Sequence, residues 1–134
     1  MAGIGLAHST VLSEEKSFQD EMLIDVHQHI NYSGRMNDAF LKHQDAMGIA
    51  KTVLLPAGSI THGDSTHKGL SNGLAAKIFG TEAAARLAAR YPKKFVYFAN
   101  EVPDLPNATK AIETWLKKGA CGIGEQKFNI AIDS

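Results

Sequence analysis

Two histidines separated by a single residue, His27 and His29, are the side chains of this chain best suited to chemistry. They lie in the segment 23–30 (LIDVHQHI), where polar and apolar residues alternate and predict a β-strand. Side chains alternate across a strand, so His27, His29 and Asp25 share one face, with the two imidazoles about 7 Å apart along the backbone. Imidazole is the commonest metal-binding side chain. The spacing therefore predicts a site for one divalent ion, in which Asp25 orients a ligand or is buried by pairing.

The opposite face of this strand is mostly apolar, since it carries Ile24, Val26 and Ile30. Such a face predicts packing under a helix. A surface strand with two solvated histidines is the alternative interpretation. The apolar residues between the histidines favour the buried strand.

Size and composition indicate one globular domain. The chain has 134 residues, of which 44% are hydrophobic and 21% charged, and its formal net charge is zero. This balance favours neither a nucleic acid nor a membrane as partner. The single cysteine, Cys121, excludes an internal disulfide and predicts a reducing, cytoplasmic location. Residues 1–21 lack the charged start of a secretory signal and are interpreted as an N-terminal tail.

Strands and helices are expected to alternate from residue 22 to residue 134. Such an order predicts an α/β domain of parallel βα repeats, with the ligand site at the carboxyl ends of the strands. The expected strands are 23–30, 51–56, 95–100 and 120–128, and the expected helices are 37–48, 74–91 with an interruption at Gly80, and 107–119.

A long polar loop, residues 57–73, follows the second expected strand. Loops of more than about 12–15 residues are usually functional or disordered. This one contains His62 and His67, which we predict as substrate-binding residues. Ordinary loop histidines are the alternative.

The motif of Asp25, His27 and His29 at the end of a first strand resembles the amidohydrolase superfamily of metal-dependent (β/α)8-barrel enzymes. The branch it resembles most is amidohydrolase family 2, the amidohydrolase-related proteins, which also contains decarboxylases. The resemblance extends from about residue 22 onward. It includes the segments 51–56 (KTVLLP), 90–95 (RYPKKF) and 122–128 (GIGEQKF).

This resemblance implies a metal-dependent hydrolase acting on a small ester, lactone or amide through a metal-activated water. His27 and His29 would bind the divalent metal, commonly zinc with manganese as the alternative. Glu125 would be a further metal ligand. Lys127 is the other candidate at this strand; it could ligate only if carboxylated, because an ammonium has no lone pair, and is otherwise expected to contact substrate. A Glu125–Lys127 pair that merely neutralises itself is a third possibility.

The chain departs from that family in length. An eight-stranded barrel takes roughly 250 residues, so four strands correspond to the N-terminal half of a TIM-barrel-like fold. The aspartate that serves the family as general base has no counterpart, and Asp133 cannot be assigned this role. We therefore expect the isolated chain to be weakly active or inactive, and to self-associate or pair with a missing C-terminal half. A decarboxylase on the same scaffold and a non-enzymatic small α/β binding domain are the alternative functions.

Overall fold

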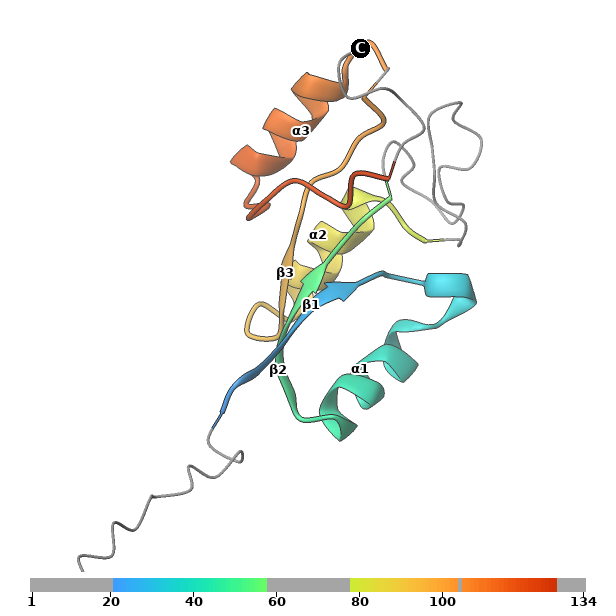
Figure 1. Cartoon of the computed structure of the whole chain (residues 1–134), viewed down its shortest axis with the longest axis vertical. Coiled ribbons are helices and arrows are strands. Elements are labelled where there is room, and N and C mark those ends of the chain that lie inside the picture. The colour runs from blue at the N-terminus through green and yellow to red at the C-terminus, as the bar shows by residue number, and fades with distance from the viewer. Residues whose placement is uncertain (1–20, 58–77, 104, 128–134) are drawn as a thin grey trace, which may run out of the picture.

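In the part of the chain that the structure describes, three parallel strands alternate with three α-helices (Figure 1). The structure is a computed structural model and describes residues 21–57, 78–103 and 105–127. The elements are β1 (Leu23–Gln28), the short 3-10 helix η2 (Tyr32–Gly34), α1 (Asn37–Ala46), β2 (Ile49–Leu54), α2 (Thr81–Arg90), β3 (Phe95–Tyr97) and α3 (Ala108–Lys117).

The strands lie side by side in chain order, β1-β2-β3, and each neighbouring pair is parallel. Thr52 of β2 is paired with Asp25 on one side and with Phe95 on the other. This arrangement confirms the predicted α/β class with a parallel sheet. It also directs the carboxyl ends of all three strands toward the same edge.

The core lies where the helices cover β2 and β3. Phe40 of α1, Leu54 of β2 and Leu87 of α2 are buried in one cluster with Phe95 and Tyr97 of β3. The rings of Phe40 and Phe95 stack with their centroids 5.5 Å apart. α2 begins at Thr81, directly after Gly80, where the sequence predicts an interruption, and its apolar face lies on β3. The helix predicted before Gly80 is wrong at Ile78 and Phe79, which are not helical, and residues 74–77 lie outside the described ranges.

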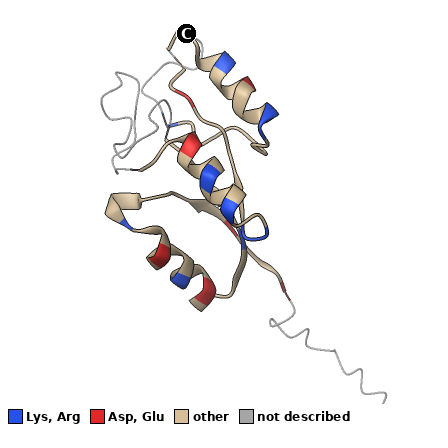
Figure 2. Cartoon of the chain, turned by 180° about the vertical axis from the view of Figure 1, so that it is seen from behind, with Lys and Arg blue, Asp and Glu red and all other residues tan. Residues whose placement is uncertain are grey.

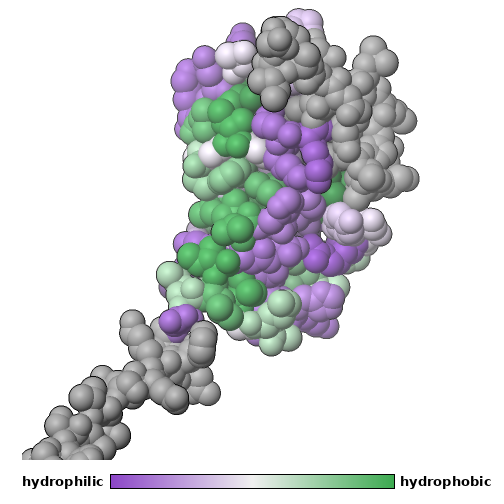
Figure 3. All heavy atoms as spheres, viewed as in Figure 1, coloured by the Kyte–Doolittle hydropathy of each residue, from purple (hydrophilic) through white to green (hydrophobic). Residues whose placement is uncertain are grey.

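The predicted burial of the apolar face of β1 is wrong. Ile24 is 49% and Val26 is 68% exposed, and only Ile30, beyond the end of the strand, is buried. The reason is that β1 is the edge strand of the described sheet, and α1 packs mainly on β2. Hydrophobic residues consequently gather on the surface beside β1 (Figure 3).

The predicted fourth strand is also wrong in its extent. Of residues 120–127, only Ile123 forms a β-bridge, which is parallel and pairs it with Ala99 just after β3. Three backbone hydrogen bonds hold this segment beside the end of β3: Cys121 N donates to Tyr97 O, Ala99 N to Gly122 O, and Gly124 N to Ala99 O. The segment therefore occupies the place of a fourth parallel strand without forming a regular one.

Other sequence predictions concern residues outside the described ranges. These are the N-terminal tail and most of the long loop with His62 and His67. In the part of the chain that is described, no helix has the length and apolar character needed to span a membrane. Each of the three helices carries side chains of both charges (Figure 2), in keeping with the zero formal net charge.

Candidate metal centre

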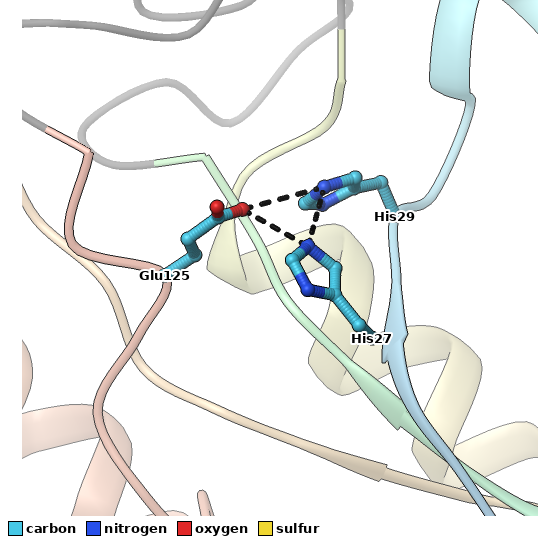
Figure 4. Close-up of side chains that lie close together, drawn as sticks. All are labelled: His27, His29 and Glu125. Carbon is cyan, nitrogen blue, oxygen red and sulfur yellow. Dashed lines mark hydrogen bonds and ion pairs between the residues drawn. The ribbon is translucent and has the colours of Figure 1, made fainter.

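Three potential metal ligands converge at the carboxyl edge of the sheet (Figure 4). His27 lies near the end of β1, His29 follows it, and Glu125 reaches them from the segment beside β3. Residues 98 positions apart in sequence thus meet because the parallel strands end at the same edge. The prediction that both imidazoles point to the same place is confirmed, although β1 shifts register between Asp25 and Gln28 and the carboxylate of Asp25 contacts Gln44 of α1 instead of the site.

The ligand atoms of these three side chains are spaced as a tetrahedral metal requires. Glu125 Oε2 lies 3.1 Å from His27 Nε2 and 3.5 Å from His29 Nε2, and the two Nε2 atoms are 3.3 Å apart. Zinc–ligand distances of about 2.0–2.1 Å in tetrahedral geometry place neighbouring ligand atoms about 3.3 Å apart. The three atoms therefore fit one small divalent ion without rearrangement and leave a fourth direction open.

His29 is the more firmly held of the two histidines. Its Nδ1 donates to the backbone carbonyl of Leu55, 2.8 Å away, which leaves the Nε2 lone pair directed at the site. Its ring stacks on Tyr32, with 5.9 Å between centroids. Burial lowers the pKa of His29 from its ordinary value, opposed by the hydrogen bond to Leu55. The neutral imidazole, which is the metal-binding form, is therefore favoured.

Arg35 holds the backbone of His29 in place. Its guanidinium donates to the backbone carbonyl of His29 at 2.9 Å and to Gln28 Oε1 at 3.0 Å, and it lies over the ring of Phe40. Burial lowers the pKa of Arg35, and the nearby charge of Asp25 opposes this. The arginine thus fixes the backbone directly after the end of β1.

His27 lies at the open side of the site, with 51% of its side chain exposed against 12% for His29. Its backbone N–H donates to Asp25 Oδ1 at 3.1 Å, and Gln44 donates to Asp25 Oδ2 at 3.4 Å. Asp25 therefore holds the backbone of His27 rather than contacting its ring. This is one of the two roles that the sequence suggests for Asp25.

The two oxygens of Glu125 have different partners. Oε2 faces the histidines, and Oε1 lies 2.8 Å from Lys127 Nζ. Burial alone would raise the pKa of Glu125, but the hydrogen bond from Lys127 and the charges of His27 and Lys127 lower it overall. The same hydrogen bond raises the pKa of Lys127. A charged carboxylate with one oxygen occupied and one directed at the histidines is suited to monodentate metal binding.

A close contact with Phe98 sets the path of the backbone that leads to Glu125. A Cβ atom at Gly122 would lie 2.8 Å from two carbon atoms of the Phe98 ring, so any other residue at this position requires the ring or the backbone to shift. The missing side chain allows the segment to lie against β3. Glu125 is thereby brought within reach of the site.

The structure brings together His27, His29 and Glu125, all of which the sequence singles out, and places Lys127 beside Glu125. His62 and His67 lie outside the described residues. Sequence reasoning missed Arg35 and Asn100. Arg35 lies in the loop after the first strand, where an arginine by itself predicts no specific role. Asn100 closes an aromatic strand segment, and a polar residue at the carboxyl end of a buried strand is the signal that could have identified it.

Comparisons with protein-family models, curated proteins and solved structures gave no match to this chain. The amidohydrolase resemblance therefore stays a prediction from the sequence. The case for function depends on the site itself.

Proposed function

We propose that this chain binds one divalent metal ion through His27, His29 and Glu125, with zinc favoured over manganese. The spacing of 3.1–3.5 Å between the three ligand atoms carries the proposal. Two histidines and one glutamate with an open fourth position form the ligand set of several catalytic zinc sites. Manganese prefers more oxygen ligands in octahedral geometry.

The reaction we propose is hydrolysis of a small ester, lactone or amide. When bound, the ion would supply Lewis-acid chemistry, lowering the pKa of a water molecule and polarising a carbonyl oxygen. His29 and Glu125 would fix the position of the centre, and the exposed His27 would form its open rim. Lys127, with 55% of its side chain exposed beside Glu125, is placed to neutralise negative charge on a substrate.

The proposal extends to the fold, which we infer to be the N-terminal half of a (β/α)8 barrel. Three parallel strands in chain order, a fourth segment in the next place and a site at the carboxyl edge support it. We accordingly propose that the isolated chain holds the metal but sustains little or no turnover. A decarboxylase would use the same ligands, and assays with substrates of each kind distinguish the two reactions.

A metal-free binding domain is the competing proposal, and one observation favours it. The carboxylate of Glu125 already has partners in Lys127 and the two histidines, so the cluster can be neutral without an ion. Metal analysis separates the two proposals.

The decisive experiment is elemental analysis of the purified chain next to a His27→Ala/His29→Ala double variant. A His43→Ala variant serves as the matched control, since His43 is an exposed histidine of α1 outside the cluster. We expect close to one zinc per chain in the parent and the control, and none in the double variant. Equal metal content in all three, or none in any, would refute the proposed site.

Activity is tested on the zinc-loaded chain with a chromogenic ester, a lactone and an amide. We expect turnover near the background rate. Steady turnover that a chelator abolishes would show that this chain alone is a complete enzyme and would overturn the expected inactivity.

A further inference from the structure

Asn100 is a buried polar residue just beyond the end of β3, with 2% of its surface exposed. Three parts of the chain meet at this residue. Its Nδ2 donates to Pro56 O at 3.1 Å and to Glu125 O at 2.8 Å, and its Oδ1 accepts from Gln126 Nε2 at 2.9 Å. Nδ2 faces two carbonyl oxygens, which can only accept, so the orientation of the amide follows from its partners.

The backbone of Asn100 is held as well. Its N–H donates to Thr81 Oγ1 and its carbonyl accepts from the same hydroxyl, both at 3.2 Å. Thr81 is the first residue of α2 and is itself buried. The side chain of Asn100 is therefore anchored on a fixed backbone and has little freedom to follow Glu125 if that residue moves.

Beyond the last backbone hydrogen bond of this segment, the side chain of Asn100 provides the next one. The hydrogen bond from Gly124 N to Ala99 O is the last that the structure gives between the two backbones. At the next residue, Glu125 O accepts from the side chain of Asn100 instead. The carbonyl of Glu125 is thus fixed by one buried amide, and with it the direction in which its side chain leaves the backbone.

We infer that Asn100 is a positioning residue that places Glu125 for metal binding, an inference that rests on the proposed metal site. Asn100 acts through Glu125 and contacts none of the three ligand atoms. Its other partner, Pro56 O, follows Leu55, whose carbonyl fixes His29. The end of β2 therefore sets the distance between Glu125 and His29 through Asn100.

The test measures zinc affinity, by competition with a chromophoric chelator, for four chains: the parent, Asn100→Ala, Glu125→Ala and the double variant. Outer partners of metal ligands typically change affinity about 10–100-fold. We expect Asn100→Ala to weaken zinc binding by about this factor in the parent, and to have almost no effect when Glu125 is already absent. An equal effect in both backgrounds, or none in the parent, would overturn the inference.

Tyr97→Phe is the matched control for loss of stability. Tyr97 is a buried residue of β3, and its hydroxyl donates to the backbone carbonyl of Lys118 at 3.1 Å, away from the site. We expect Tyr97→Phe to destabilise the chain but to leave zinc affinity unchanged. If it weakened zinc binding as much as Asn100→Ala does, Asn100 would have only a general structural role.

Failure of the metal site and failure of the role of Asn100 give different results in this test. If the parent binds no zinc, the proposed function fails; if the parent binds zinc and Asn100→Ala binds it equally well, only the present inference fails. Should Asn100→Ala not fold, Asn100→Gln replaces it in the same comparison. Gln keeps the amide but extends it by one carbon, so we expect it to fold and still to weaken zinc binding in the parent background alone.

Discussion

The two walls of the site are built in different ways. The first wall carries His27 within β1 and His29 just beyond its end; the pairing of β1 with β2 shifts register between Asp25 and Gln28, and the outer face of β1 is exposed. The second wall, residues 121–125 with Glu125, has almost no regular pairing and is held by specific contacts with Phe98 and Asn100. The two-residue period of extended backbone brings both histidines to one side, and the hydrogen bond to Leu55 O then holds His29, whereas the second wall needs a separate contact for each residue that must be placed.

Both walls are held by hydrogen bonds to the two residues that directly follow β2, the second wall through Asn100. Leu55 O accepts from His29, and Pro56 O, one residue later, accepts from Asn100. Adjacent carbonyls of one buried segment thus hold His29 directly and the backbone of Glu125 through Asn100. A binding site assembled in this way depends more on the carboxyl end of β2 than on either wall alone.

Removing a ligand from either wall should have the largest effect. We expect His29→Ala and Glu125→Gln each to lower zinc affinity more than about 100-fold, beyond the range of outer partners. Chelator competition measures both. If Glu125→Gln bound zinc as tightly as the parent, Glu125 would not be a ligand and the second wall would not belong to the site.

A methyl group at Gly122 should disturb the second wall without touching a ligand. Gly122→Ala places a Cβ 2.8 Å from the Phe98 ring, and overpacking of this kind costs about 1–3 kcal/mol. Urea unfolding measures the loss. Phe98→Leu in the same chain should recover part of it, and a double variant no more stable than Gly122→Ala would contradict the proposed clash.

Local sequence predicted the first wall better than the second, for a physical reason. The alternation around His27 and His29 is a property of the strand itself and can be found without knowledge of the fold. Burial of Ile24 and Val26 could not be judged in this way, because it depends on whether β1 is covered. The position of Glu125 depends on Phe98 and Asn100, whose contacts arise only when distant segments meet.

The pH dependence of the free energy of unfolding should distinguish His29 from an exposed histidine such as His43. Because burial lowers the pKa of His29 in the folded state, the unfolded chain takes up a proton as pH falls below about 6.5 while the folded chain does not. Stability should therefore decrease from pH 6.5 downward until the lowered pKa is reached. The lowered pKa of Glu125 acts in a separate and more acidic range, below the ordinary glutamate value of 4.5.

Urea unfolding of the metal-free parent and of His29→Gln, at several pH values between 7 and 5, measures this effect. His29→Gln should lose the decrease that begins near pH 6.5, and His43→Gln, at an exposed position, should retain it. A parent whose stability does not change over this range would show that His29 is as readily protonated in the folded chain as in the unfolded one.

The smallest effect is expected on the outer face of β1. Val26 is 68% exposed, so Val26→Lys should change the free energy of unfolding by no more than about 0.5 kcal/mol. Leu54→Ala in the neighbouring strand, at 0% exposure, should cost about 2–5 kcal/mol by the same urea measurement. The contrast tests whether the first wall is anchored by its hydrogen bonds to β2 rather than by packing of its apolar side chains.

The same variant bears on the proposed pairing with another chain. If the apolar residues beside β1 are covered in an assembly, Val26→Lys should leave the monomer stable but lower its association, which sedimentation velocity measures over a range of concentrations. An exposed apolar edge strand favours pairing, and a lysine on such a strand opposes it. A parent that stays monomeric at all concentrations would show that the chain does not pair with itself, and would leave a separate C-terminal half as the proposed partner of this edge.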